Sequence, residues 1–356
     1  MVIVAGACGI AAGTPLAILG AIGRAAQRGV IVKGGRALEV LARVDVAVLD
    51  KTGTLTRGSP LLTAVQPVVG IREDDLLAAA AVAEARSEHP FAQPIRRAAR
   101  ERALSVAPPD VFAYTPGQGI VCRAAAAEIV VGSRALLRRH GIPIIEYGGS
   151  DHASEIFVAR DARMLGTLRF EDPVRLEARA AIDGLHALGI TTALLTGDGA
   201  AAATAVGRTL GIDRIEAEMV PEEKLRRIDA LRAEGRTVMM VGDGVNDAPA
   251  LTRAHVGVAM GSGTDVARET ANVMLLGNDL LALVDALRIA RRCHRIIMVN
   301  FVGTLAVDGA GMVLAAVGLL DPVLAAFVHV SSELLFILNS ARLLRRGRAA
   351  DSRARA

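Results

Sequence analysis

Two apolar runs near the end of the chain, at residues 296–320 and 322–338, constrain the fold most strongly. A helix needs about 20 apolar residues to cross the hydrocarbon core of a bilayer, and each run is close to that length. The short break at Asp321 and Pro322 favours a turn, because proline starts a helix well but disfavours helix in the residue before it. The runs predict an antiparallel pair of membrane helices; a buried helical pair of a soluble protein is the alternative.

A third apolar run opens the chain. Residues 2–22 carry no charge and no basic segment precedes them, so a secretory signal peptide fits poorly. We interpret residues 1–25 as a further membrane helix. Arginines cluster at 342–348, after the last apolar run, as is typical of the cytoplasmic flank of a membrane helix. The sequence therefore predicts an integral, multi-pass membrane protein.

The composition excludes two other classes. Aromatic residues make up only 3% of the chain, so few rings could stack on bases, and we expect no nucleic-acid partner. The three cysteines, Cys8, Cys122 and Cys293, are far apart and odd in number, which argues against a disulfide framework or a paired-cysteine metal site. The soluble part is therefore expected in the cytoplasm.

Between the apolar ends, the pattern is that of an α/β protein. A short strand-like run at 46–49 ends at Asp50, and further strand-like runs at 192–195, 238–241 and 256–259 alternate with helical stretches. This alternation predicts a parallel, doubly wound sheet. Several strands end in Gly-containing loops that bear Asp, where open α/β sheets bind ligands, so one active site built from several segments is expected.

The intervening stretch has a different character. From 57 to 168 the sequence changes to Ala-rich helices and short strands, for example at 128–131 and 156–159. A change of pattern inside an α/β alternation indicates an inserted α+β domain.

Asp50, Lys51 and Thr52 open the string Asp-Lys-Thr-Gly-Thr at 50–54. A carboxylate can accept a phosphoryl group covalently when nearby cations neutralise the incoming phosphate. Lys51 and the backbone amides of a Gly-containing loop can supply part of that stabilisation. The string, with Leu-Thr after it, resembles the phosphorylation signature of P-type ATPases.

A second string lies almost two hundred residues downstream. In the stretch 241–251, Asp243 and Asp247 stand four apart on either side of Asn246. Carboxylate oxygens of this kind hold Mg²⁺, which usually keeps several waters and bridges to substrate phosphate. The stretch resembles the hinge motif of P-type ATPases, whose phosphorylation domain has the haloacid dehalogenase-like fold.

Further pieces resemble the same family in the expected order. Thr196, Gly197 and Asp198 resemble its phosphate-contacting Thr-Gly-Asp loop, and the Pro-Glu-Glu-Lys string ending at Lys224 resembles the segment whose lysine neutralises the phosphate. The loop at 261–265 resembles the small-residue loop after the hinge motif.

The resemblance implies the roles of these residues. Asp50 would attack the γ-phosphate of ATP, with Mg²⁺ held by Asp50, the Thr52 carbonyl and Asp243. Thr196 and Lys224 would stabilise the transferring group. Asn246 and Asp247 would complete the site.

The inserted segment carries Ser-Glu-His-Pro at 87–90, which resembles a motif of the heavy-metal-transporting subfamily. The resemblance implies that His89 contacts the adenine of ATP and that Glu88 lies nearby; alone, such a histidine is more often a surface residue. Gly117, Gly119 and Gly132 resemble the glycines that line the same pocket, where they let the backbone approach the nucleotide.

Ionisable residues inside apolar runs are costly and mark functional candidates. Asp308 lies in the middle of one run, and His329 and Glu333 lie four apart in the other, on one helix face. They could bind a divalent transition metal; the alternative is hydrogen bonding between helices. Cys8 occupies the place of the subfamily's Cys-Pro metal motif but lacks the proline and a second cysteine.

The resemblance predicts the layout of the chain. We expect a membrane helix at 1–25, a connection with the first part of the phosphorylation domain at 26–56, and a nucleotide-binding domain at 57–168. The second part of the phosphorylation domain is expected at 169–285, two membrane helices at 292–343 and a basic cytoplasmic tail at 344–356. The family's actuator domain and earlier helices are not represented, so an N-terminal pump half is an expected partner.

The sequence is therefore predicted to be the truncated catalytic half of a P-type ATPase. It would use ATP to transport a cation, expected to be a divalent transition metal, and the reaction would pass through an aspartyl-phosphate intermediate. Full turnover is in question, because no loop of the actuator type is present to activate the hydrolytic water. One alternative is a phosphatase of the same fold, which would carry Asp at position 52. Another is a nucleotide-binding membrane remnant without catalysis. The sequence indicates neither the metal, nor the direction of transport, nor the oligomeric state.

Overall fold

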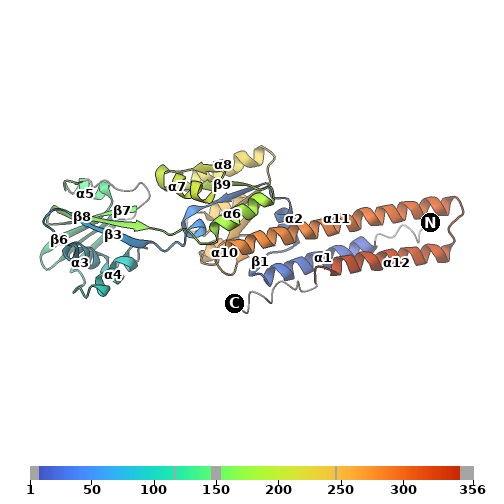
Figure 1. Cartoon of the computed structure of the whole chain (residues 1–356), viewed down its shortest axis with the longest axis horizontal. Coiled ribbons are helices and arrows are strands. Elements are labelled where there is room, and N and C mark those ends of the chain that lie inside the picture. Colours follow the sequence, from blue (N-terminus) through green and yellow to red (C-terminus); the bar gives the residue numbers. More distant parts are fainter. Residues whose placement is uncertain (1–7, 116–117, 146–153, 245–246, 345–356) are drawn as a thin grey trace. The chain divides into compact units, whose positions relative to one another are not determined.

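The computed structural model describes residues 8–115, 118–145, 154–244 and 247–344 (Figure 1). The chain divides into two compact units. The first comprises the residues up to 54, 176–197 and those from 209 onward, and the second comprises 55–175 and 198–208.

The first unit is built on a seven-stranded sheet with the order β1-β13-β12-β11-β2-β9-β10. All neighbouring strands are parallel except β1, which pairs antiparallel with β13 at the edge. The central strands are buried along their whole length, as is typical of parallel sheets covered on both faces. The strands are β1 Val30–Val32, β2 Val46–Leu49, β9 Thr191–Leu195, β10 Arg214–Glu216, β11 Val238–Gly242, β12 Val256–Ala259 and β13 Val273–Leu275.

Helices alternate with these strands, as the doubly wound pattern requires. They are α2 Gly35–Ala42, α6 Ala178–Ala187, α7 Ala200–Leu210, α8 Pro221–Ala233, α9 Ala248–Arg253 and α10 Asp265–Thr270. Most of α7 is assigned to the second unit.

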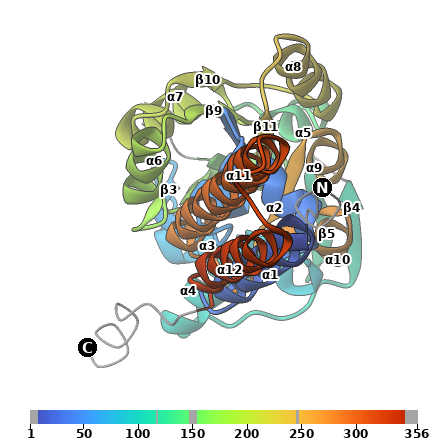
Figure 2. The same cartoon turned by 90° about the vertical axis from the view of Figure 1, so that its right-hand side faces the viewer.

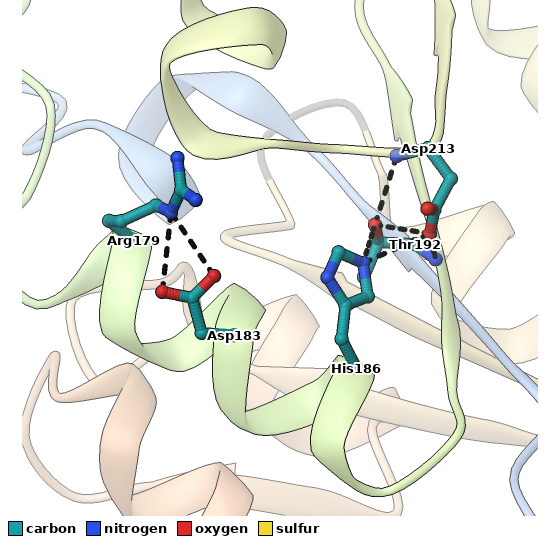
Figure 3. A network of polar contacts seen from close by, with 5 residues as sticks. All are labelled: Arg179, Asp183, His186, Thr192 and Asp213. Atoms are coloured by element: carbon teal, nitrogen blue, oxygen red, sulfur yellow. Dashed lines mark hydrogen bonds and ion pairs between the residues drawn. The ribbon is translucent and has the colours of Figure 1, made fainter.

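A polar network fixes the start of β9 (Figure 3). Asp213 accepts hydrogen bonds from the Thr192 backbone N–H at 2.7 Å and from its hydroxyl at 3.0 Å, and His186 Nε2 lies 3.0 Å from the same carboxylate. Partial burial alone would raise the pKa of Asp213, but the Thr192 and His186 contacts hold it below its ordinary value. On the same helix as His186, Arg179 pairs with Asp183 at 3.1 Å. The contacts of Asp213 anchor the strand that ends at Leu195, directly before Thr196.

The second unit contains a six-stranded antiparallel sheet in the order β3-β8-β7-β6-β5-β4. Leu76, Leu77 and Ile95 of its helices pack with Phe170 in its core. The strands are β3 Leu61–Pro67, β4 Val111–Thr115, β5 Gly119–Ala124, β6 Ala127–Gly132, β7 Ser154–Arg160 and β8 Arg163–Glu171, and the helices are α3 Glu73–Ala83, α4 Ala92–Glu101 and α5 Arg134–Arg139.

Three helices of the first unit, α1 (Cys8–Ala26), α11 (Leu280–Ala316) and α12 (Pro322–Ala341), lie side by side (Figure 2). Polar contacts join α11 and α12: Asn300 donates to the Ser340 hydroxyl at 2.9 Å, and Asn339 donates to Asn300 at 2.8 Å. The Asp321 carboxylate accepts from two backbone N–H groups at the start of α12, at 2.8 and 2.9 Å, which explains why that helix begins there.

The helix α11 is longer than its apolar part. It begins sixteen residues before the apolar run and is 37 residues long. Its first half packs on the α/β unit, where the Arg291 guanidinium donates to the carbonyls of Leu188 and Val44. One continuous helix therefore joins the sheet region to the apolar segment.

Among the described residues, α11 and α12 are long and apolar enough to cross a membrane. Only 22% and 11% of their most apolar windows are buried, whereas a core helix of a soluble protein would be mostly covered. Exposed side chains include Met298, Phe301, Leu305, Val313, Phe327 and Leu335. This finding supports the predicted helical pair over the soluble alternative. The role of α1 as a membrane helix stays a prediction.

Candidate active site

The site lies at the carboxyl ends of three adjacent strands. In the central sheet β2 has β11 on one side and β9 on the other, and Leu49 pairs with Val241 and with Leu194. The Asp50 N–H donates to the Val241 carbonyl at 3.0 Å. The residues that follow these strands therefore meet at one edge of the sheet, as ligand sites of open α/β sheets do.

Lys224 lies at the centre of this edge. Its ammonium donates to Asp50 Oδ1 at 2.6 Å and to Asp247 Oδ1 at 2.8 Å, and all three side chains are at most 9% exposed. Lys224 comes from the first turn of α8, whose start is capped by the Glu223 carboxylate accepting from the Val220 N–H at 3.1 Å. Segments far apart in the sequence thus form one buried charged cluster.

Asp243 lies against the loop that follows Asp50. Gly53 has a φ of +72°, a conformation that favours glycine, and a Cβ at that position would collide with the Asp243 carboxylate. The glycine therefore allows the close approach of Asp243 to the Asp50 loop.

The charges in the cluster do not balance. Burial, followed by the Asp247 charge and to a lesser degree the Asp243 charge, raises the pKa of Asp50 to about 7 against the opposing effect of Lys224. Burial alone would lower the pKa of Lys224, but Asp50 and Asp247 raise it above its ordinary value. The Lys224 ammonium contacts two of the carboxyl groups, and the third, Asp243, lies near enough to Asp50 to raise its pKa. The acidic groups therefore outnumber the lysine, which favours binding of a cation.

The other predicted site residues are placed as follows. Thr196 is buried at the end of β9, and its N–H donates to the Glu216 carbonyl at 3.1 Å. Gly197 and Thr52 are exposed, Lys51 is half-buried, Asp198 belongs to the second unit, and Asn246 lies outside the described residues. The structure brings together Asp50, Lys224, Asp243 and Asp247; the catalytic roles of all these residues stay predictions.

A family model described as haloacid dehalogenase-like hydrolase matches residues 44–255, more than half of the chain, and a second model of that description matches 226–287. The chain belongs to the haloacid dehalogenase-like hydrolase family. The predicted fold class is therefore confirmed: a haloacid dehalogenase-like sheet, a second antiparallel sheet of the nucleotide-binding type, and two long apolar helices.

Within this family the chain is a homologue of heavy-metal P-type ATPases, as the motifs predicted. It is 36% identical over 98% of its length to the probable copper-exporting P-type ATPase V of Mycobacterium tuberculosis, covering 46% of that protein. It is 39% identical over 97% of its length to the manganese-exporting P-type ATPase of Mycobacterium bovis, covering 49% of it. The chain thus spans about half the length of these curated relatives.

A solved structure extends this similarity to three dimensions. A zinc-transporting PIB-type ATPase in its E2·Pi state superposes with a TM-score of 0.79 at 36% identity, over 95% of this chain and 56% of that one. The similarity includes the long apolar helices as well as the haloacid dehalogenase-like part, because it extends over nearly the whole chain.

The second unit has a cavity of about 170 Å³. The predicted residues His89, Gly119 and Gly132 line it, whereas Glu88 is exposed and is not among the lining residues. Gly117 lies outside the described residues. The remaining lining residues are Glu84, Phe91, Tyr114, Gln118, Ile120, Val131, Ser133, Glu155 and Ile156.

The structure explains why glycine stands at the two lining positions 119 and 132. A Cβ on Gly119 would collide with the Val131 carbonyl, and one on Gly132 would collide with the Gln118 carbonyl. Their absence of side chains lets β5 and β6 approach closely at the cavity wall.

Glu84 and Phe91 are among the lining residues that sequence reasoning missed. Glu84 is 3% exposed, and its Oε2 has no hydrogen-bond partner among the described residues. Burial raises the pKa of Glu84, while Ser87 and Arg96 oppose the shift. The Phe91 ring packs between His89 and Phe170, with centroids 4.9 and 4.5 Å away. The available signal was that Glu84 is the single charged residue in the apolar stretch 76–85.

The candidate ion ligands of the apolar helices also come together. His329 Nε2 lies 3.1 Å from Glu333 Oε1, and Nδ1 lies 3.9 Å from Asp308 Oδ1 on the other helix. The side chain of Cys8 is outside the described part of the structure. Within that part, no three His, Cys, Asp or Glu side chains are grouped so that they could hold a metal ion. As the helices stand, the His329 ring lies between the two carboxylates, nearer to Glu333 than to Asp308.

Proposed function

We propose that the chain is phosphorylated on Asp50 by ATP, as the catalytic half of a heavy-metal P-type ATPase. The observation that carries the proposal is the buried Lys224 ammonium, 2.6 Å from Asp50, with Asp243 packed against the same loop. A carboxylate held beside a cation at a strand end is suited to accept a phosphoryl group.

In the proposed step an Asp50 oxygen attacks the γ-phosphorus of ATP. The new O–P bond forms as the bond to the β-phosphate oxygen breaks, and ADP leaves. The Lys224 ammonium would shift from neutralising Asp50 to neutralising the transferred oxygens, because the negative charge moves onto the phosphoryl group. Thr196, buried beside the end of the neighbouring strand, would donate a hydrogen bond from its hydroxyl to an oxygen of that group.

The residues present fit Mg²⁺. Asp50, Asp243 and the Thr52 carbonyl would hold the ion, with Asp247 supporting the cluster, and the surplus negative charge there favours a cation. Mg²⁺ typically uses one or two carboxylates plus water and substrate phosphate, so a site with fewer than three protein carboxylate ligands is adequate. When bound, the ion would neutralise charge on the phosphates.

ATP would bind through the cavity of the second unit. The Phe91 and His89 rings offer an apolar and aromatic surface for the base, and the unpartnered Glu84 Oε2 offers an acceptor for an exocyclic amine. Adenine carries such an amine, and satisfying a buried acceptor removes a desolvation cost.

The phosphatase alternative predicts a general acid two residues after the nucleophile. Thr52 stands at that position. A threonine does not protonate a leaving group as a carboxylic acid does, which favours a lasting phosphoenzyme.

We further propose that α11 and α12 cross a membrane with the α/β units in the cytoplasm. Asp308, His329 and Glu333 would contribute ligands for a transported divalent metal, and Cys8 is a further candidate. Carboxylate and imidazole suit borderline or hard metals. A complete pathway would need additional helices from an N-terminal pump half, because the chain spans about half of its curated relatives.

Phosphoenzyme formation tests the proposal. The full chain incubated with γ-phosphate-labelled ATP and Mg²⁺ is expected to retain acid-stable label that hydroxylamine removes, since acyl phosphates react with it. Label from α-phosphate-labelled ATP serves as the control and should not be retained. Release of free phosphate without any trapped label would favour the phosphatase, and neither product would favour the inactive remnant.

Glu84→Gln is expected to weaken ATP binding by about tenfold, because a hydrogen bond to a charged acceptor becomes one to a neutral amide. Calorimetric titration of the full chain with ATP measures the change. Glu88→Gln is the matched control: it removes the same charge four residues away, on an exposed side chain. If both substitutions weakened ATP binding equally, or if neither weakened it, the assignment of Glu84 would be contradicted.

A further inference from the structure

A second cavity, lined mainly by charged side chains, lies in the first unit where the apolar helices meet the sheet region. It measures about 190 Å³ and is lined by four arginines, Arg24, Arg28, Arg288 and Arg292, and one acid, Asp285. Arg24 lies in the last turn of α1, and Arg288 and Arg292 lie one turn apart on α11. We call this cavity the arginine pocket.

The charges of the arginine pocket are mostly uncompensated. Asp285 is shared by two partners, Arg28 at 3.2 Å and Arg288 at 3.1 Å. Arg24 and Arg292 have no hydrogen-bond or ion-pair partner within the described part of the chain. Four positive charges thus face one negative charge around one cavity. Such a grouping is repulsive unless an anion occupies it.

The pocket lies at the level expected for lipid headgroups. Arg292 precedes Met298, the first exposed large apolar side chain of α11, by six residues, or about 9 Å of helix. On α1, Arg24 follows the 66% exposed Leu19 by five residues, about 8 Å. The headgroup layer on each side of a bilayer is roughly 5–8 Å thick. Both helices therefore place arginines at or just beyond that layer.

We propose that the arginine pocket binds the phosphate group of an anionic phospholipid from the adjacent leaflet. Guanidinium groups bind phosphate oxygens in pairs, and basic pockets between membrane helices suit such headgroups. The exposed apolar surface of α11 begins about 9 Å along the helix from Arg292 and would contact the acyl chains. The proposal depends on α11 and α12 crossing a bilayer but not on phosphorylation of Asp50.

Lipid titration tests the proposal. The full chain in nonionic detergent is titrated with short-chain phosphatidylglycerol or phosphatidylcholine, and bound lipid is counted by native mass spectrometry. We expect phosphatidylglycerol to bind at least tenfold more tightly. Arg24→Gln and Arg292→Gln should each reduce its binding about tenfold, and neither substitution removes a hydrogen bond or ion pair between described residues. The matched control is Arg295→Gln, an exposed arginine of α11 outside the pocket lining, which should bind like the parent chain.

Three results would overturn the proposal. Equal binding of both lipids would exclude a charge-selective pocket. An equal loss in Arg295→Gln would indicate diffuse surface charge in place of a defined site. Displacement of the lipid by glycerol 3-phosphate at similar concentration would indicate a site for a soluble phosphate. Labelling with γ-phosphate-labelled ATP, measured in parallel, separates this outcome from failure of the phosphoenzyme proposal.

Discussion

Asp50→Asn is expected to reduce the hydroxylamine-labile label from ATP by at least about a thousandfold. The same substitution should make the chain more stable at neutral pH. The amide oxygen is a far weaker nucleophile than a carboxylate, so no acyl phosphate should form. Removal of the charge also relieves the repulsion from Asp247 and Asp243 that, after burial, raises the pKa of Asp50.

The stability gain should depend on pH in a defined direction. The pKa of Asp50 is raised from 3.8 to about 7, so the folded state holds the proton more tightly than the unfolded state. The protonated Asp50 carboxyl therefore contributes fully to the free energy of unfolding below about pH 4, and this contribution is lost as the pH rises through about 7. The difference in unfolding free energy between Asp50→Asn and the parent chain should grow across this window, on the order of 1 kcal/mol or more.

Chemical unfolding in Mg²⁺-free buffer at pH 5 and pH 8 measures this difference. Asp183→Asn is the control, because Asp183 is an exposed partner of Arg179, and surface pairs contribute only about 0–1 kcal/mol. Label that persisted in Asp50→Asn would show that another residue is the nucleophile. A variant less stable than the parent at pH 8 would contradict the charge surplus.

Lys224→Met is expected to reduce labelling by about a hundredfold or more and to lower the unfolding free energy by about 3–5 kcal/mol. Methionine fills much of the same volume but leaves Asp50 and Asp247 buried without the ammonium that now contacts both, at 2.6 and 2.8 Å. The cost arises because unpaired buried carboxylates lose hydration.

A double variant separates folding from catalysis. Lys224→Met with Asp247→Asn should regain much of the stability, because one buried charge is removed, but labelling should stay low. Arg226→Met, two residues along the same helix with its side chain 75% exposed, controls for loss of a positive charge. If Lys224→Met kept normal stability and labelling, the ammonium would have neither role.

Sequence patterns predicted that Asp50 and the loops after two other strands lie at one edge of the sheet, and there is a physical reason for this. The run before Asp50 is apolar and short, and its neighbours around 192–195 and 238–241 have the same character, so parallel pairing brings their ends together. The pairing of Lys224 with both Asp50 and Asp247 was less accessible, because it depends on how α8 packs.

Other features carried weak local signals. The edge strands β1 and β13 are three residues each, too short for a clear periodicity. The first half of α11 contains many arginines and has no apolar run that marks it as part of a long helix. Glu84 was overlooked in favour of Glu88 because the motif drew attention to the exposed residue, whereas burial decides which of the two reaches the cavity.

The unbroken course of α11 has a mechanical consequence. The helix is 37 residues long, or about 55 Å, and Arg291 ties it to the Val44 carbonyl, two residues before β2 begins. A rigid rod held at one point amplifies small rotations. Beyond Arg291 the helix continues for 25 residues, about 38 Å, so a tilt of about 5° at that point would sweep the far end by roughly 3 Å. Strain generated beside Asp50 could therefore act on Asp308 by leverage, with no chain of intermediate side chains required.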